Sequence, residues 1–332
     1  MGFRRASSSE RRRGDVFAFR LPFRGVVVLS ALILAGALVL LLTHQDNTRA
    51  VAAQLRRLPA TSLAAAFAFV LAQIAFQGLR LWAVFPRRFR VGPGRVLHAF
   101  TLGEWLNMFV PARSGDAVKI LLIGQEPQPG SPSLPAVTGA ILADKVVDLA
   151  SVIVLCLGGG LLGVLWSGTS SRLLTAGVCA TVALILLVVL RFCGEGLRAR
   201  LWARLRSLTE GFTALRDPTR GLTSLSFSLA AWAAEGCALW ILCSALGAAL
   251  APAAILLALV VLNLGIGVPI AVANLGVYEL ALAAGLGRAG VPLPTALAIA
   301  VSHHGIELLA VTFGVACVWL RTIATPLQQA RR

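Results

Sequence analysis

The sequence has little charge: only 13% of its 332 residues are Asp, Glu, Lys or Arg, whereas 58% are hydrophobic. Soluble domains carry about 25% charged residues, which they need to cover their surface. Several apolar runs in the sequence are also long enough to cross a lipid bilayer. The composition therefore excludes a soluble globular protein and predicts an all-α polytopic membrane protein.

Acidic residues are scarce, with 14 Asp and Glu against 30 Lys and Arg, for a net charge of +16. In a soluble protein this excess would suggest nucleic-acid binding, but the basic runs lack the interleaved aromatic residues that stack on bases. In a membrane protein, Arg collects in cytoplasmic loops and faces anionic lipid. We therefore expect anionic membrane lipids as partners and no nucleic acid.

The sequence also lacks the motifs of several enzyme and metal-site classes. It contains no Walker A motif, no nucleotide-binding glycine loop and no catalytic Ser-His-Asp signature. None of its six cysteines belongs to a C-x-x-C pair, and all lie in or beside apolar segments, where they pack as small hydrophobic residues. We expect no cofactor, no metal site and no enzymatic activity.

Six apolar segments are predicted to span the bilayer. Five of them cover about 25–43, 61–84, 173–190, 222–246 and 294–320, and the remaining one, third in the chain, starts near Leu134. A basic cytoplasmic tail (1–24) precedes them and a short tail (321–332) follows, so residues 25–320 are predicted to form a single transmembrane domain. Its halves are about 25–166 and 173–320, with a basic, amphipathic connector at 191–221.

Two further stretches, Leu97–Lys119 and Leu262–Leu286, are too polar to span lipid and too apolar for exposed loops. Pro111 and the Arg113–Gly115 run would break a helix near the middle of the first stretch. Polar backbone at membrane depth is tolerated only where protein or a water-filled cavity surrounds it. We predict a re-entrant hairpin in each stretch, with turns following Pro111 and Pro269.

The two halves resemble each other at an offset of 156–161 residues. Leu71–Trp82 aligns without gaps on Leu229–Trp240, and Leu134–Leu149 aligns on Leu293–Leu308. Each half would hold three spans and a hairpin, an odd number of crossings, so we predict inverted repeats, which are typical of transporters. The distribution of Lys and Arg then places both termini on the cytoplasmic side of the membrane.

Seven of the 14 acidic residues lie in predicted membrane elements. An acid facing lipid at the bilayer centre costs about 2.5–3.5 kcal/mol, so these side chains must face inward, pair or stay neutral. With nearby polar residues they form the predicted substrate-binding set: Glu104, Asn107, Arg113, Asp116, Lys119, Asp144, Lys145, Asp148, Glu235, Asn274, Glu279, His303, His304 and Glu307.

Helical spacing suggests partners for some of these charges. Lys145 lies three residues before Asp148 and can pair with it, either for packing alone or as one wall of a headgroup or proton path. Arg80 lies near the end of its span and can extend to the interface. Glu235 has three candidate partners, namely Arg113, Lys119 or a histidine.

His303, His304 and Glu307 fit a hydrogen-bonded His–Glu pair or a proton relay better than a metal site. Adjacent residues on a helix point in different directions, and no further ligand is evident. The half-helix ends near Pro111–Asp116 and Asn274–Glu279 offer free backbone groups that could hold a phosphate or a carboxylate.

Three motifs carry a resemblance to a known family. They are Asn107-x-x-x-Pro111-x-Arg113-x-Gly115-Asp116, Asp144-Lys145-x-x-Asp148, and Pro269 followed by Gly276-Val277-Tyr278-Glu279. With them, nearly the whole chain after the basic tail resembles the transmembrane flippase-like domain of lysylphosphatidylglycerol synthases and their stand-alone relatives. The resemblance implies inverted repeats and lipid handling.

The sequence departs from this family in three ways. The family usually has Glu-Arg at the place of Asp144-Lys145 and Arg at the place of Tyr278, and here no aminoacyl-transferase domain follows the membrane region. The resemblance therefore does not imply lysine transfer. Stand-alone relatives are associated with lipids of several kinds, including isoprenoid and hopanoid pathways, so the substrate stays open.

The leading hypothesis is a flippase-like transporter that moves a polar-headgroup or isoprenoid-type lipid across the bacterial inner membrane without chemical change. The alternative is a membrane-embedded transferase, or an accessory subunit of an envelope-lipid synthase, with inward carboxylates as acid and base. A third interpretation is a scaffold for such a synthase. If the protein is an accessory subunit or a scaffold, a lipid-synthesis enzyme would be its partner in addition to membrane lipids.

Overall fold

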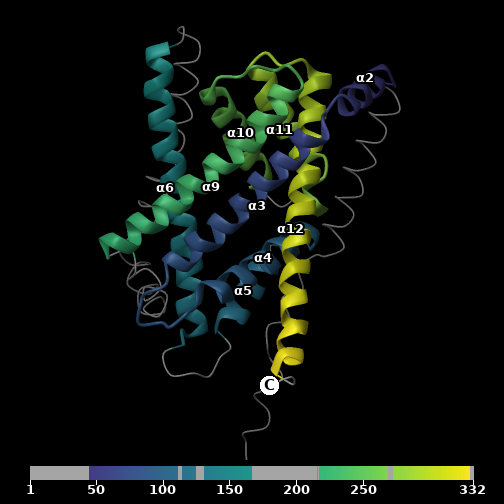
Figure 1. Ribbon diagram of the computed structural model, residues 1–332. Coiled ribbons are helices and arrows are strands. Elements are labelled where there is room, and N and C mark those ends of the chain that lie inside the picture. Colours follow the sequence, from purple (N-terminus) through teal and green to yellow (C-terminus); the bar gives the residue numbers. More distant parts are fainter. Residues whose placement is uncertain are drawn as a thin grey trace, which may run out of the picture.

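The computed structural model describes residues 45–110, 114–124, 131–166, 215, 217–267 and 272–329, and these form helices and no strands (Figure 1). Two predicted spans, 25–43 and 173–190, and most of the predicted connector lie outside the described residues. The helices of the first half are α2 (Gln45–Arg56), α3 (Ala60–Ala83), α4 (Pro93–Phe109), α5 (Ser114–Gly124) and α6 (Leu134–Trp166). Those of the second half are α9 (Pro218–Ala245), α10 (Pro252–Ile266), the short η3 (Val272–Asn274), α11 (Val277–Arg288) and α12 (Leu293–Gln329).

Three of the described helices are long and apolar enough to cross a membrane: α3, α9 and the Leu293–Leu320 part of α12. Each matches a predicted span to within a few residues, because a long apolar run without an internal proline is a strong helix signal. The start of α9 also follows local rules, with Pro218 in its first turn and Asp217 accepting a hydrogen bond from the Thr219 amide at 3.0 Å. The prediction of an all-α, multi-pass membrane protein is confirmed.

Two pairs of short helices, α4 with α5 and α10 with α11, take the place of long spans, and the members of each pair pack together. Glycines allow this close packing. A Cβ atom on Gly115 would lie 1.8 Å from the Gly103 carbonyl oxygen, and one on Gly285 would lie 2.7 Å from the Ala258 Cα atom. The backbone before α11 is irregular, since Ala273 and Asn274 both have φ of 53°.

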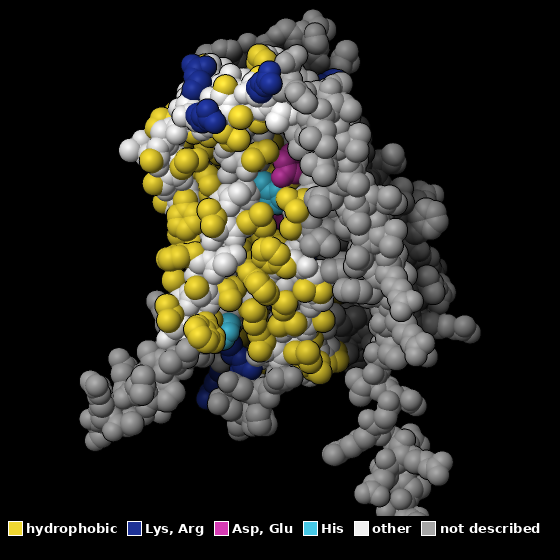
Figure 2. Space-filling view, turned by 90° about the vertical axis from the view of Figure 1, so that its right-hand side faces the viewer, with side chains coloured by type: hydrophobic (Ala, Val, Ile, Leu, Met, Phe, Trp, Pro, Cys, Tyr) yellow, Lys and Arg dark blue, Asp and Glu magenta, His cyan; other side chains and the backbone are white. Residues whose placement is uncertain are grey.

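The two helices α3 and α9 pack along each other at the centre of the molecule and run in opposite directions (Figure 1). Between the basic side chains near its two ends, the described part of the face seen in Figure 2 is covered mainly by hydrophobic side chains. Large exposed apolar residues such as Phe69, Leu309 and Phe313 would be unfavourable in water and are suited to contact with lipid. The polar side chains of the spans therefore have to gather inside the bundle.

Candidate substrate cavity

A cavity of about 400 Å³ lies between α3, α6, α9, α12 and the short helices. Its volume is within the range of small-molecule sites, roughly 300–1,000 Å³. Both halves of the chain contribute to its lining. Nine of the predicted site residues line it: Glu104, Asn107, Asp116, Lys145, Asp148, Glu235, Asn274, His304 and Glu307.

Four predicted site residues do not line the cavity, namely Lys119, Asp144, Glu279 and His303. Each of them contacts a residue that does, as described below. Arg113 lies outside the described residues. Six polar lining residues were missed by the sequence analysis as site residues: Gln73, Gln77, Arg80, Trp232, Asn263 and Tyr278.

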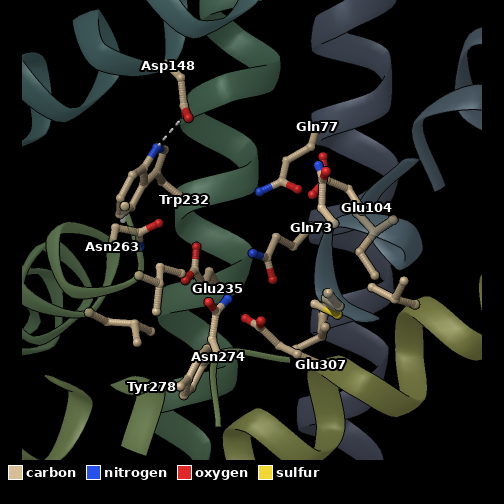
Figure 3. A pocket seen from close by; sticks show the side chains of 18 of the residues that line it. Gln73, Gln77, Glu104, Asp148, Trp232, Glu235, Asn263, Asn274, Tyr278 and Glu307 are labelled. Carbon is tan, nitrogen blue, oxygen red and sulfur yellow. Dashed lines mark hydrogen bonds between the residues drawn. The ribbon is translucent and has the colours of Figure 1, made fainter. Parts of the chain in front are cut away.

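At one end of the cavity, the buried Arg80 of α3 joins two carboxylates of α6. Its guanidinium donates two hydrogen bonds to Asp144, from Nε at 2.7 Å and from Nη2 at 3.1 Å, and a further bond from Nη1 to Asp148. From α9, Ser228 Oγ lies 3.1 Å from Arg80 Nη1, and the Trp232 indole donates to Asp148 at 3.2 Å (Figure 3). The planar guanidinium can serve both carboxylates at once, so this cluster ties three helices together.

Two predictions about these charges are wrong. Arg80 does not extend to the interface, since only 2% of it is exposed. Asp148 pairs with Arg80 rather than with Lys145, which is exposed and makes no ion pair among the described residues. The physical reason is that Arg80 can reach both Asp144 and Asp148 from a neighbouring helix, whereas the Lys145 side chain leaves α6 in a different direction.

A second cluster joins α4 to α5. The Lys119 ammonium lies 2.5 Å from Glu104 and 2.9 Å from Asp116, and 4.8 Å from the centre of the Phe100 ring. Lys119 is only 2% exposed, while both carboxylates reach the cavity. Lys119 is therefore committed to its own helix pair and is not the partner of Glu235.

A third cluster joins α11 to α12. Glu279 Oε1 lies 2.7 Å from His304 Nδ1, and the Tyr278 ring stacks on the His304 ring with centroids 4.1 Å apart. The Tyr278 hydroxyl is 2.6 Å from His303 Nδ1. These contacts fix the two imidazoles against α11, in keeping with the predicted His–Glu hydrogen bond, although Glu279 rather than Glu307 is the close partner.

The backbone groups at the two broken helix ends are less free than the sequence suggested. The Gly115 amide donates to Asn107 Oδ1 at 2.9 Å, and the Gly276 amide donates to Glu279 Oε2 at 2.7 Å. Each of these side chains caps the start of a short helix, as an anion would otherwise do. These two amides are therefore occupied by the protein itself and are not available to a phosphate.

Replacing Tyr278 with phenylalanine tests the third cluster. The change keeps the stacking ring but removes the hydroxyl bonded to His303, whose Nε2 already has no partner among the described residues. A buried polar group that loses its partner costs about 1–3 kcal/mol, so the melting temperature in detergent should fall measurably. The control is Thr312→Val, which removes an exposed hydroxyl bonded to its own helix. Equal effects of the two changes would contradict the assigned role of the Tyr278 hydroxyl.

Two carboxylates in the middle of the cavity are not held by a close ion pair among the described residues; the nearest basic atom is His303 Nδ1, 3.9 Å from Glu307 Oε1. Glu235 of α9 and Glu307 of α12 point into the same space as Gln73 and Asn274 (Figure 3). Neither carboxylate has a Lys or Arg partner among the described residues. The cavity and its clusters thus hold more acidic than basic groups: Glu104, Asp116, Asp144, Asp148, Glu235, Glu279 and Glu307 against Arg80, Lys119 and Lys145.

Three of the missed residues left a signal in the sequence. Two acids four residues apart on one helix require more positive charge than Lys145 alone provides, and Arg80 was the only Lys or Arg inside the preceding span. Gln77 aligns with Glu235 in the two halves and so shares its inward face. Asn263 follows a leucine in the second half as Asn107 does in the first, at the same offset as the other matches. No comparable signal marks Gln73, because a single amide in an apolar run is compatible with either face of a helix.

The comparison with protein families agrees with this architecture. A family model described as the lysylphosphatidylglycerol synthase TM region matches residues 27–314. No curated protein matches the chain. Since the family match covers most of the chain, including both hairpin regions and all three clusters, this membrane protein belongs to the lysylphosphatidylglycerol synthase TM region family, which links it to lipid synthesis or modification.

Proposed function

We propose that the protein is a lipid transporter of the flippase type, and that the headgroup of its substrate crosses the membrane through the central cavity. The observation that carries this proposal is the composition of the cavity wall, where carboxylates and amides from both halves face one space inside an apolar bundle. Polar groups at this depth are costly unless they serve one another or a polar ligand. The acyl or isoprenoid tails would remain in the surrounding lipid.

The arrangement of the helices supports the inverted repeat that this function needs. The helix contacts of one half have counterparts in the other: α4–α5 and α10–α11, α5–α6 and α11–α12, α3–α4 and α9–α10, α3–α12 and α9–α6, α4–α12 and α10–α6. In Figure 1, α6 and α12 run in opposite directions, and the α4–α5 pair lies toward one end of the molecule while α10–α11 lies toward the other. Two re-entrant hairpins that approach the cavity from opposite sides would give alternating access.

The proposal also includes the orientation of the chain. The Arg-rich segments 1–24 and 191–221 and the Arg-containing loop after α3 fall on one side of such a repeat. The positive-inside rule assigns that side to the cytoplasm of a bacterial inner membrane, with both termini there.

Transport is tested with the purified full-length protein in liposomes that carry fluorescent lipids in both leaflets, with a quencher that reaches only the outer one. Wild-type protein should move lipid between leaflets, and a panel of anionic, zwitterionic and isoprenoid-phosphate lipids should reveal the preferred headgroup. Gln77→Trp places a bulky ring in the cavity wall and should lower the rate severalfold. The matched control is Leu309→Trp, which adds the same ring outside the cavity, at a residue that is 64% exposed, and should leave the rate unchanged.

The same samples separate the alternatives. Lipid extracted after the assay should be chemically unchanged if the protein is a transporter. A modified headgroup would instead support a membrane-embedded transferase, with the cavity carboxylates as its acid and base groups. Neither movement nor modification of any lipid would favour an accessory role beside a lipid-synthesis enzyme. Equal rates for Gln77→Trp and Leu309→Trp would show that the cavity is not the path.

A further inference from the structure

Gln73 presents a buried acceptor without a donor at the centre of the cavity. Its side chain is 94% shielded from solvent, since only 6% of the residue is exposed, and its Oε1 atom has no hydrogen-bond partner among the described residues. It comes from α3 and points toward Glu235 and Glu307 (Figure 3). A buried acceptor left unsatisfied is costly, so this oxygen indicates a missing donor or cation.

The carboxylates of Glu235 and Glu307 also need a positive charge. Glu235 is only 6% exposed and has no ion-pair partner among the described residues. The nearest base to Glu307 is His303, at 3.9 Å from Nδ1 to Oε1, but that nitrogen is already bonded to the Tyr278 hydroxyl. Two carboxylates that share a site cannot both keep their charge without compensation.

The surroundings do not supply this compensation. Arg80 and Lys119 are each held by two carboxylates of their own, and His304 is held by Glu279. Lys145 also lines the cavity, but among the described residues it forms no ion pair with Glu235 or Glu307. The other charged or titratable groups around the pair are Glu104 on α4, Asp148 on α6, Tyr278 and Glu279 on α11, and His303 on α12. The acids among them add negative charge, so they favour the uptake of a cation.

We infer that Gln73, Glu235 and Glu307 form a binding site for one small monovalent cation, either a proton or Na⁺. A proton would convert one carboxylate to a carboxyl group whose O–H can be donated to a neighbouring oxygen such as Gln73 Oε1. Na⁺ would be coordinated by the same three oxygen-bearing groups, with the amides of Asn263 and Asn274 beside them. Both histidine Nδ1 atoms are engaged elsewhere, by the Tyr278 hydroxyl and by Glu279, and the oxygen ligands that remain suit a proton or Na⁺ better than a transition metal.

Three helices meet at this site, since Gln73 lies on α3, Glu235 on α9 and Glu307 on α12. Occupancy therefore changes the charge at the contact between the two halves. Cation binding would favour one arrangement of the two halves over the other and so could couple the cation to transport. This coupling role rests on the proposed transport function. Binding of the cation itself does not depend on transport.

The experiment measures thermal unfolding of the purified full-length protein in detergent, first against pH without Na⁺, then against NaCl with choline chloride and KCl as controls. For the proton, the folded state binds it more tightly than the unfolded state, so stability should be present at low pH and lost as pH rises. For Na⁺, the melting temperature should rise with NaCl at alkaline pH and not with the control salts. Glu235→Gln with Glu307→Gln should abolish whichever response the wild type shows.

Two further variants keep the test decisive. Glu104→Gln removes a cavity carboxylate that is paired with Lys119, so it should lower stability but keep the response to pH or Na⁺. Gln73→Leu should weaken the response without removing it, and single Glu307→Gln replaces the double variant if the latter fails to fold. A wild type and a Glu307→Gln variant with the same dependence on pH and on Na⁺ would overturn the inference, as would loss of the response in Glu104→Gln.

These measurements separate the site from the transport function. A normal ion response in a protein that moves no lipid would keep the site and reject the transporter. Lipid movement that proceeds without any ion response in the unfolding assay would reject the site and keep the transporter.

Discussion

Replacement of Arg80 with leucine is expected to destabilise the protein by about 3–5 kcal/mol, the range found when one partner of a buried ion pair is removed. Asp144 and Asp148 would then keep their charges inside the bundle without a cation, and Asp144 is only 2% exposed. Most of this loss comes from the two stranded carboxylates rather than from the missing guanidinium. The melting temperature in detergent and the yield of monodisperse protein are the measurements.

Three variants distinguish the buried cluster from a general effect of removing a basic residue. Lys145→Leu, on the same helix as the two acids, should have a small effect because Lys145 is exposed and lacks an ion pair among the described residues. Arg80→Lys should be intermediate, since one ammonium cannot replace a planar guanidinium that reaches two carboxylates. Combining Arg80→Leu with Asp144→Asn and Asp148→Asn should recover much of the loss. Equal effects of Arg80→Leu and Lys145→Leu would contradict the assignment.

The helices could be predicted from the sequence because their signals are local. The apolar runs of α3 and α9 fix both helices to within a few residues. The ends of α4 at Phe109 and of α10 at Ile266 lie close to Pro111 and Pro269, beside which helix breaks were predicted. Each of these features depends on the order of neighbouring residues alone.

The partners of the buried charges could not be predicted in the same way. Whether Arg80 reaches lipid headgroups or Asp144 depends on how α3 is rotated against α6, and both outcomes are compatible with its position near the end of an apolar run. Similarly, the i,i+3 spacing of Lys145 and Asp148 allows a pair, but a better partner on another helix took its place. Partner choice is a property of packing between helices.

Glu279 illustrates a second limit. Its charge at the start of a half-helix suggested contact with a substrate, whereas in the structure it caps the Gly276 amide and binds His304. A polar side chain at a helix end serves either the helix or a ligand, and the sequence contains no information on which need is met. The polar face of the cavity could therefore be predicted, but not its division into structural clusters and free groups.

The packing of α4 against α5 leads to the second large expected effect, that of Gly115→Ala. A Cβ atom at this position would lie 1.8 Å from the Gly103 carbonyl oxygen and 2.7 Å from Asn107 Oδ1. The first neighbour is a backbone atom, so the helices must separate. Overpacking of a well-packed core costs about 1–3 kcal/mol, and more where the backbone itself has to move. Separation would also weaken the 2.9 Å bond between the Gly115 amide and Asn107 and so displace two lining residues, Asn107 and Asp116.

Two glycines of α4 provide a graded control for this change. A Cβ atom on Gly103 would lie 2.9 Å from the Gly115 carbonyl oxygen and 2.5 Å from the Lys119 side chain, so its clash with the backbone is smaller than the 1.8 Å approach at Gly115, and Gly103→Ala should destabilise the protein less than Gly115→Ala. Gly94 has no atom within 4 Å of the same position, and Gly94→Ala should be neutral or slightly stabilising, as expected for alanine in a helix. Melting temperatures and leaflet exchange in liposomes should follow the same order. If Gly115→Ala behaved like Gly94→Ala in both assays, α4 and α5 would not be in the close contact on which this wall of the cavity depends.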